Sequence, residues 1–314
     1  MMTVAKMRLV IISPLFILTL LLFSCKKELP NSETLPLDQE IRNCKPASSN
    51  KKKVLFIGID GCRTDALLNS NTPAIDSLIA TGFFISTVDR GPNTVSVPGW
   101  STLLHGVFPA KHGLLDNSFD QQDNFAQYPD MFYYIRQQHP EYNLCVLTNW
   151  YNFLRLTADE DYAVDVASDL ELKDSAIWLL DNCSPDMLVL HFDDPDHAGH
   201  TYGFDPLQPE YIAAIEQTDI YISEIMNTIR QRETDLNEKW MIVVCTDHGG
   251  SGTSHGGQDG NPATRYVFLV LNGEGIPNHN QQGNAANTDV FPSIMKYLDI
   301  PVQESWGLDG TSLY

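Results

Sequence analysis

From Val54 onward, short apolar runs alternate with longer amphipathic segments, and this alternation limits the possible folds more than any other feature of the sequence. Most of the apolar runs are continuous, which is typical of strands buried on both faces of a sheet. Such strands, joined by helices, predict an α/β fold: a three-layer sandwich with a mainly parallel central sheet and helices on both faces. The expected strands are residues 54–59, 83–88, 143–148, 187–192, 241–246 and 266–271, and the expected helices are 73–81, 98–105, 129–138, 168–182, 209–231 and 288–298.

Residues 1–24 have the pattern of a signal peptide. Lys6 and Arg8 precede an apolar run over residues 9–23, which is shorter than the roughly 20 residues that cross a bilayer. The sequence LFSC, ending at Cys25, is similar to a bacterial lipobox, which implies cleavage before Cys25 and a lipid anchor on it. The alternative is a plain secretory signal followed by an incidental cysteine. We therefore expect an exported lipoprotein of a bacterial cell envelope, facing the periplasm or the surface.

Residues 25–53 lack apolar periodicity and are rich in Pro, Ser, Asn and Lys, so we expect a flexible tether. Residues 54–314 contain no internal repeat and predict a single domain. Cys145 and Cys245 lie inside apolar runs and are expected in the core. Cys44 could form a disulfide with another cysteine, but the spacing does not say with which.

The chain is strongly acidic, and this excludes one class of function. It has 40 Asp and Glu against 20 Lys and Arg, a formal net charge of −20, and no basic tract. A surface that binds nucleic acid needs clustered positive charge to neutralise phosphates. The acidic residues are therefore solvated, or they hold cations.

Aspartate and histidine residues follow three of the expected strands. Asp60-Gly61 follows residues 54–59, the sequence DDPDHAGH (193–200) follows 187–192, and Asp247-His248 follows 241–246, with His255 seven residues later. Each pattern alone is weak, because Asp-Gly after a strand is usually a turn and His-Gly is common in loops. Together they place carboxylates and imidazoles at one edge of the sheet, where open α/β sheets carry their functional groups.

Mixed Asp and His ligands suit a borderline cation such as zinc. Three carboxylates and three imidazoles are too many for one tetrahedral ion with an open position, so they predict two divalent cations that share a substrate. A further polar residue, Ser96, lies just before an expected helix that has Pro98 in its first turn. The free backbone N–H groups expected at such a helix start would suit a phosphate. The alternatives are that Ser96 only caps the helix, or that nearby Thr94 is the reactive hydroxyl.

Four segments together resemble the alkaline phosphatase superfamily, and specifically its type I phosphodiesterase/nucleotide pyrophosphatase branch. They occur in that family's order and, with the C-terminal region, extend over roughly residues 54–314. The segments are IDGCRTDAL (59–67), SVPGWSTLLHGVFPAKHGLLDN (96–117), DPDHAGHTYG (194–203) and TDHGG (246–250).

The resemblance implies a role for each matching residue. Ser96 would be the nucleophile, and Asn117 would donate to a non-bridging phosphate oxygen. Asp193 and His197 have the same spacing as Asp196 and His200 and are the rival pair for the second ion. The implied metal ligands are Asp60, Asp247, His248 and Ser96 for one ion, and Asp196, His200 and His255 for the other.

The implied activity is metal-dependent hydrolysis of a small phosphodiester or a nucleotide pyrophosphate through a covalent phosphoserine intermediate. Trp150 and Tyr151 favour a diester that carries an organic group, whereas Arg155 keeps a phosphomonoesterase open. A sulfatase-like hydrolase is a further alternative, although formylglycine sulfatases have an arginine where Trp100 stands. An envelope phosphoryl-headgroup transferase and a non-catalytic binding lipoprotein are the remaining alternatives.

Overall fold

The computed structural model describes residues 51–281 and 285–314. The predicted signal peptide, nearly all of the predicted tether, Cys25 and Cys44 lie outside the described residues. Cys145 and Cys245 are buried in strands, as expected, and Cys183 forms a disulfide. Within the described part of the chain, no helix combines the length and the apolar composition that crossing a bilayer requires.

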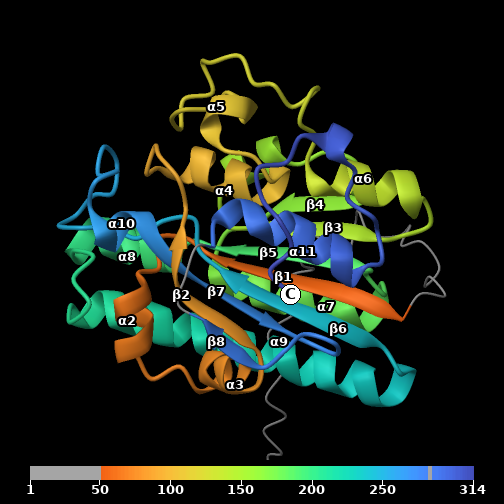
Figure 1. Ribbon diagram of the computed structural model, residues 1–314. Coiled ribbons are helices and arrows are strands. Elements are labelled where there is room, and N and C mark those ends of the chain that lie inside the picture. Colours follow the sequence, from red (N-terminus) through yellow and green to blue (C-terminus); the bar gives the residue numbers. More distant parts are fainter. Residues whose placement is uncertain (1–50, 282–284) are drawn as a thin grey trace, which may run out of the picture.

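The fold is built on one eight-stranded sheet, ordered β4-β3-β5-β1-β6-β7-β2-β8 (Figure 1). Of these strands only β7 runs against its neighbours, so the sheet is mainly parallel, as predicted. The strands are β1 (Lys52–Ile59), β2 (Phe83–Asp89), β3 (Leu144–Thr148), β4 (Tyr162–Asp165), β5 (Met187–Phe192), β6 (Lys239–Cys245), β7 (Tyr266–Asn272) and β8 (His279–Gln281).

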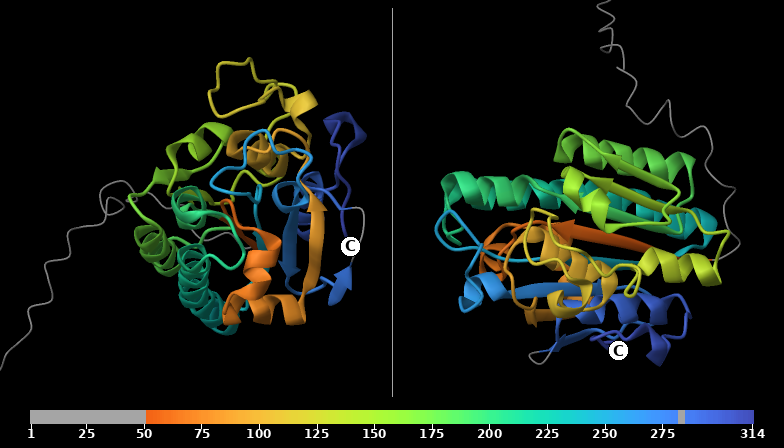
Figure 2. Two further views of the ribbon diagram at one scale, coloured as in Figure 1. Left: turned by 90° about the vertical axis from the view of Figure 1, so that its left-hand side faces the viewer. Right: turned by 90° about the horizontal axis from the view of Figure 1, so that it is seen from above.

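Helices cover both faces of this sheet, which gives the three layers that the sequence predicted (Figures 1 and 2). One face packs against α4 (Ser96–His105), α6 (Met131–Gln138) and α11 (Val290–Tyr297). The other packs against α2 (Thr64–Asn69), α3 (Pro73–Thr81), α7 (Asp169–Asn182) and α9 (Pro209–Leu236). The shorter helices are α5 (Pro109–His112), α8 (Asp194–Tyr202), α10 (Pro262–Arg265), η1 (Tyr151–Leu156), η2 (Asn287–Asp289) and η3 (Glu304–Trp306).

All six expected strands and all six expected helices are present, with boundaries that shift by a few residues. The helix expected at 98–105 begins earlier, at Ser96, because Val95 already has the extended backbone of an N-cap. The sequence analysis did not predict α8, which occupies the polar segment after β5. Its first turn contains Pro195, and Gly203 ends it with a φ of 112° that favours glycine.

The register of the three central strands brings the predicted site residues to one edge. β1 lies between β5 and β6, and Gly58 is opposite both His191 and Cys245. Because the three strands are parallel, the segments that begin at Asp60, at Asp193 and at Thr246 leave the sheet at the same edge.

The absence of a side chain at Gly58 makes room for the indole of Trp100. A Cβ atom at Gly58 would lie 2.5 Å from Cη2 of Trp100, whose side chain is fully buried. We therefore expect Gly58→Ala to destabilise the protein by about 1–3 kcal/mol, the usual cost of overpacking a core. Denaturant unfolding measures this, with Gly260→Ala as the control because a Cβ there meets no atom within 4 Å. Equal stability of the two variants would contradict the packing role of Gly58.

Candidate metal and active site

Three buried carboxylates meet beyond the carboxyl ends of β1, β5 and β6. Asp60 and Asp247 are almost fully buried and Asp196 is 8% exposed. One oxygen of each, Asp60 Oδ1, Asp196 Oδ1 and Asp247 Oδ2, is buried without a hydrogen-bond partner among the described residues. A buried unsatisfied carboxylate oxygen is costly, and a bound cation is the usual way to satisfy it.

Three imidazoles converge on the same region, and each has Nδ1 close to a backbone carbonyl. Nδ1 of His248 lies 2.9 Å from the carbonyl of Gly249, that of His255 lies 2.8 Å from the carbonyl of Thr94, and that of His200 lies 2.9 Å from the carbonyl of Thr253. A carbonyl oxygen only accepts, so each Nδ1 carries the proton and donates it. In the neutral ring Nε2 then keeps its lone pair, which is the arrangement of histidines that bind a metal.

The first predicted ligand set surrounds Nε2 of His248. That atom lies 3.1 Å from Ser96 Oγ, 3.2 Å from Asp247 Oδ2 and 3.4 Å from Asp60 Oδ1. A tetrahedral zinc ion with bonds of about 2.0–2.2 Å separates its ligand atoms by roughly 3.3–3.6 Å. The three separations lie within this range or about 0.2 Å below it, and Asp60, Asp247 and His248 form one of the clusters able to hold a metal.

The second predicted set also comes together. Nε2 of His200 lies 3.3 Å from Asp196 Oδ2 and 3.0 Å from Nε2 of His255. Asp196 can approach because residue 61 is glycine: a Cβ at Gly61 would lie 2.4 Å from Asp196 Oδ1. The rival pair does not join this set, because the side chain of His197 is 78% exposed and the buried Asp193 clusters with Asp60 and His191.

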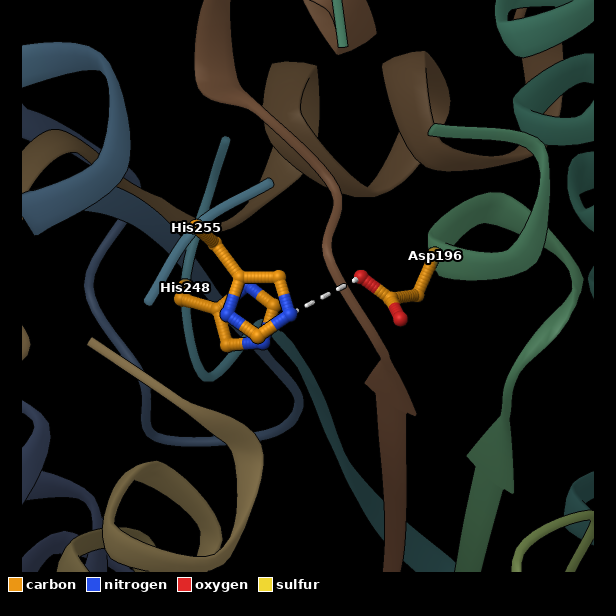
Figure 3. Close-up of side chains that lie close together, drawn as sticks. All are labelled: Asp196, His248 and His255. Atoms are coloured by element: carbon orange, nitrogen blue, oxygen red, sulfur yellow. Dashed lines mark ion pairs between the residues drawn. The ribbon is translucent and has the colours of Figure 1, made fainter. Parts of the chain in front are cut away.

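The two sets are in contact with each other. The rings of His248 and His255 stack with centres 3.7 Å apart, and Asp196, His248 and His255 form a third combination able to hold a metal. Figure 3 shows that the carboxylate of Asp196, on α8, faces the two stacked rings, which belong to the loop after β6. The side chain of His200 is 41% exposed, whereas that of His248 is fully buried, so the paired sets extend from the solvent into the core.

Ser96 is the first residue of α4 and is held close to the first set. Its neighbour Val97 donates its backbone N–H to Asn117 Oδ1 at 2.9 Å. This N–H is therefore not free, contrary to the sequence expectation of free N–H groups at the helix start. It serves instead to orient Asn117. The Nδ2 of Asn117 has no partner among the described residues and can donate to another group.

Thr94, the other hydroxyl considered, is fully buried and has a structural role. Its Oγ1 donates to the carbonyl of His255 at 2.7 Å, while its own carbonyl accepts from that ring. Arg90 was not anticipated from the sequence. Its buried guanidinium donates to the carbonyls of Pro92, Val95 and Asp247, and so joins the segment before Ser96 to the end of β6.

Two other residues at the site also escaped the sequence analysis. Trp100 Nε1 and His191 Nε2 both contact Asp60 Oδ2, at 2.9 Å and 3.0 Å. Trp100 had been considered only as the residue that replaces an arginine. His191 lies within an apolar strand, and a polar residue in such a run is the signal that could have identified it.

The electrostatics of the clustered acids favour cation binding. Burial raises the pKa of Asp247 well above its usual range, and the charge of Asp60 adds to this. Burial would also raise the pKa of Asp60, but hydrogen bonds from His191 and Trp100 and the nearby imidazoles lower it. The hydrogen bond to Asp196 raises the pKa of His200 to about 9. Positive charge between these carboxylates would relieve their repulsion.

The fold is that of the alkaline phosphatase superfamily. Residues 54–131 and 132–264 match the family model described as type I phosphodiesterase/nucleotide pyrophosphatase. The chain therefore belongs to the type I phosphodiesterase/nucleotide pyrophosphatase family.

Curated relatives are distant and longer. GPI ethanolamine phosphate transferase 2 of Schizosaccharomyces pombe is 24% identical over 286 residues, which is 80% of this chain and 36% of that protein. Human bis(5'-adenosyl)-triphosphatase ENPP4 is 22% identical over 224 residues, which is 65% of this chain and 48% of that protein. The chain thus spans between about a third and a half of the length of these relatives.

Solved structures share the fold at low identity. A 2-O GAG sulfatase superposes with a TM-score of 0.66 at 14% identity, covering 84% of this chain and 73% of that one. Murine ectonucleotide pyrophosphatase/phosphodiesterase 5, in complex with AMP, superposes with a TM-score of 0.58 at 14% identity, covering 80% and 96%.

We expect zinc loading at pH 7.5 to release about one proton from His200, because the ion takes the lone pair that a proton otherwise holds. Calorimetry in buffers of different ionisation enthalpy counts the protons. His200→Ala should lower the number, and the exposed His197→Ala is the matched control. Equal release by all three proteins would remove His200 from the ligand set.

Proposed function

We propose that the protein hydrolyses a phosphodiester or a nucleotide pyrophosphate, with Ser96 as the nucleophile. The observation that carries this proposal is the position of Ser96 Oγ, 3.1 Å from His248 Nε2, an atom that itself lies 3.2 Å and 3.4 Å from two carboxylate oxygens without partners. Membership of the family supports the same reaction class. The fit of the two ligand sets supports two divalent cations, and the donor types favour zinc.

Each residue has a distinct role in the proposed reaction. Asp60, Asp247 and His248 would hold one cation, and Asp196, His200 and His255 the other. Bound cations of this type lower the pKa of a coordinated hydroxyl and neutralise charge on phosphate oxygens. Ser96, held at the start of α4, attacks phosphorus in line with the leaving oxygen: the bond from Ser96 Oγ to phosphorus forms as the bond from phosphorus to the leaving oxygen breaks, and the leaving group departs with a proton. Water then attacks the phosphoseryl ester, the bond from Ser96 Oγ to phosphorus breaks, and the remaining phosphate monoester and the Ser96 hydroxyl are released.

Asn117 would stabilise the developing charge. Because Val97 fixes the amide oxygen of Asn117, the amide nitrogen is left to donate to a non-bridging oxygen of the substrate. A donor held in place before the reaction needs no reorganisation in the transition state.

A diester is favoured over a monoester because two arginines near the site are already engaged. Arg90 donates to three carbonyls, and Arg63 bonds Asp65 and the carbonyls of Phe204 and Gly250. Arg155 remains: its guanidinium lies 3.6 Å from the ring centre of Phe119 and forms no ion pair within the described chain. Arg155 could therefore bind the additional charge of a monoester, and a phosphomonoesterase is the alternative function.

A headgroup transferase is the second candidate, and the S. pombe relative is the specific reason to retain it. In that reaction an alcohol, rather than water, attacks the phosphoseryl ester. Product analysis with a competing alcohol separates the two. With a transferase, the fraction of product that is the new ester should greatly exceed the fraction of alcohol in the solvent.

The proposed activity is tested with three nitrophenyl esters in parallel. The zinc-loaded full chain should hydrolyse bis-p-nitrophenyl phosphate faster than p-nitrophenyl phosphate, and p-nitrophenyl sulfate slowest. Faster turnover of the monoester would favour the phosphomonoesterase, and faster turnover of the sulfate would favour the sulfatase-like reading. No turnover of any ester by a metal-loaded sample would favour a binding protein.

Ser96→Ala should abolish most turnover while leaving zinc content unchanged, because three protein ligands of the first set remain. His200→Ala should lower zinc content itself, since it removes one of three ligands of the second set. Elemental analysis beside the rate measurement distinguishes these results. Equal turnover in wild type and both variants would refute the assignment.

We also propose that the protein is a lipoprotein of a bacterial envelope, anchored through Cys25. The support is the sequence alone: a charged start, an apolar run and the LFSC segment. Cys25→Ser should move the protein from the membrane fraction to the soluble fraction after export, and immunoblotting of fractions measures this. Unchanged membrane association of the variant would contradict the anchor.

A further inference from the structure

His191 is a fully buried histidine on β5 that no predicted ligand set includes. Its ring is packed among aromatic side chains, with centres 4.8 Å from Phe153, 5.0 Å from Trp100 and 5.9 Å from Trp150. A polar ring in such surroundings requires hydrogen bonds at both nitrogens.

Both nitrogens of His191 have a partner, and the contact with Asp60 places a proton on Nε2. Nε2 lies 3.0 Å from Asp60 Oδ2, and Nδ1 lies 3.2 Å from Thr148 Oγ1. An ionised carboxylate oxygen only accepts, so Nε2 carries the proton and donates it to Asp60. The Thr148 hydroxyl also donates to the carbonyl of Trp150 at 3.0 Å, so Nδ1 shares that single hydrogen or donates to Oγ1 itself; in both cases Nε2 donates to Asp60.

Asp60 consequently has two different oxygens. Oδ2 receives the N–H groups of His191 and Trp100, whereas Oδ1 has no hydrogen-bond partner in the described chain and lies 3.4 Å from Nε2 of His248. Turning the carboxylate out of this orientation would break both donated bonds. Because Asp60 is almost fully buried, water could not readily replace them. The two donors thus fix the orientation of the carboxylate, so that one of its two equivalent oxygens faces the first ligand set.

We propose that His191 is a positioning residue: with Trp100 it holds Asp60 so that Oδ1 alone is presented to the cation beside Ser96. This inference rests on the two-ion site of the proposed function. It predicts that His191 controls the affinity of that one site and leaves the site of Asp196, His200 and His255 unchanged.

One other reading makes His191 a ligand itself. Asp60, His191 and Asp193 lie close enough together to hold a further ion. Against this, Oδ2 of Asp60 already accepts two N–H groups, and a ligand role would require His191 to give up its proton at Nε2. The two readings differ in stoichiometry, because the ligand reading adds a third ion.

The experiment measures stepwise Zn²⁺ affinities of the full chain by competition with a chromophoric chelator, after the protein has been stripped of metal. His191→Phe keeps a buried aromatic ring and removes the donor, whereas His191→Gln can return an N–H at a similar reach. His200→Ala identifies which affinity belongs to the second set. His112→Gln is the matched control, since His112 is also fully buried and lies near a threonine hydroxyl, at 3.4 Å from Thr102, outside both ligand sets. Thermal unfolding of each metal-free variant is measured in parallel.

For His191→Phe we expect one affinity to fall 10–100-fold, the usual effect of losing a residue that orients a metal ligand, while the other stays constant. His191→Gln should recover most of this loss, and His112→Gln should show none. A purely structural role would lower the melting temperature of the metal-free protein without separating the two affinities, and would overturn the proposal.

Unchanged affinities in His191→Phe, or an equal fall at both sites, would also overturn it. The proposal would also be overturned if the wild type bound three ions and His191→Phe bound two. A wild type that binds no Zn²⁺ would reject the proposed function together with the inference. Two bound ions with the predicted effect of His191, but no turnover of any ester, would reject only the proposed activity.

Discussion

Repulsion among buried carboxylates is the constraint around which this end of the molecule is organised. Asp60, Asp196 and Asp247 converge because their strands are parallel and adjacent, and each retains one oxygen without a hydrogen-bond partner in the described structure. Negative charges that lie close together in a poorly solvated site destabilise one another strongly. The protein supplies only part of the compensation, through donors such as Trp100 and His191. Divalent cations would supply the rest, so the stability of this region and its chemistry depend on the same interaction.

The surrounding structure holds these groups in place from behind. Arg90 joins the segment before Ser96 to the carbonyl of Asp247, and Thr94 bonds the segment of His255. Backbone carbonyls orient all three imidazoles. Much of the precision of the site therefore comes from main-chain contacts between loops that are far apart in sequence.

Those contacts explain which parts of the fold and of the site could be predicted from the sequence and which could not. Continuous apolar runs identified the six main strands, because burial on both faces leaves a strong signal in residues such as 54–59 and 187–192. The site residues followed from their positions after these strands and from the resemblance. α8 was missed because its polar residues face a cluster rather than a core, so they show no helical periodicity. His191 was missed because its partner, Asp60, lies 131 residues away. The tie between Val97 and Asn117 likewise depends on tertiary folding.

The gradient of exposure across the paired ligand sets has a kinetic consequence. The side chain of His200 is 41% exposed, while those of Asp247 and His248 are fully enclosed. A cation in the outer position can be reached directly by a competing chelator or by another metal from the medium. One in the inner position would be enclosed by fully buried side chains and reached less readily. The outer position would therefore equilibrate with the ions of its compartment, and the inner one would keep the ion acquired during folding.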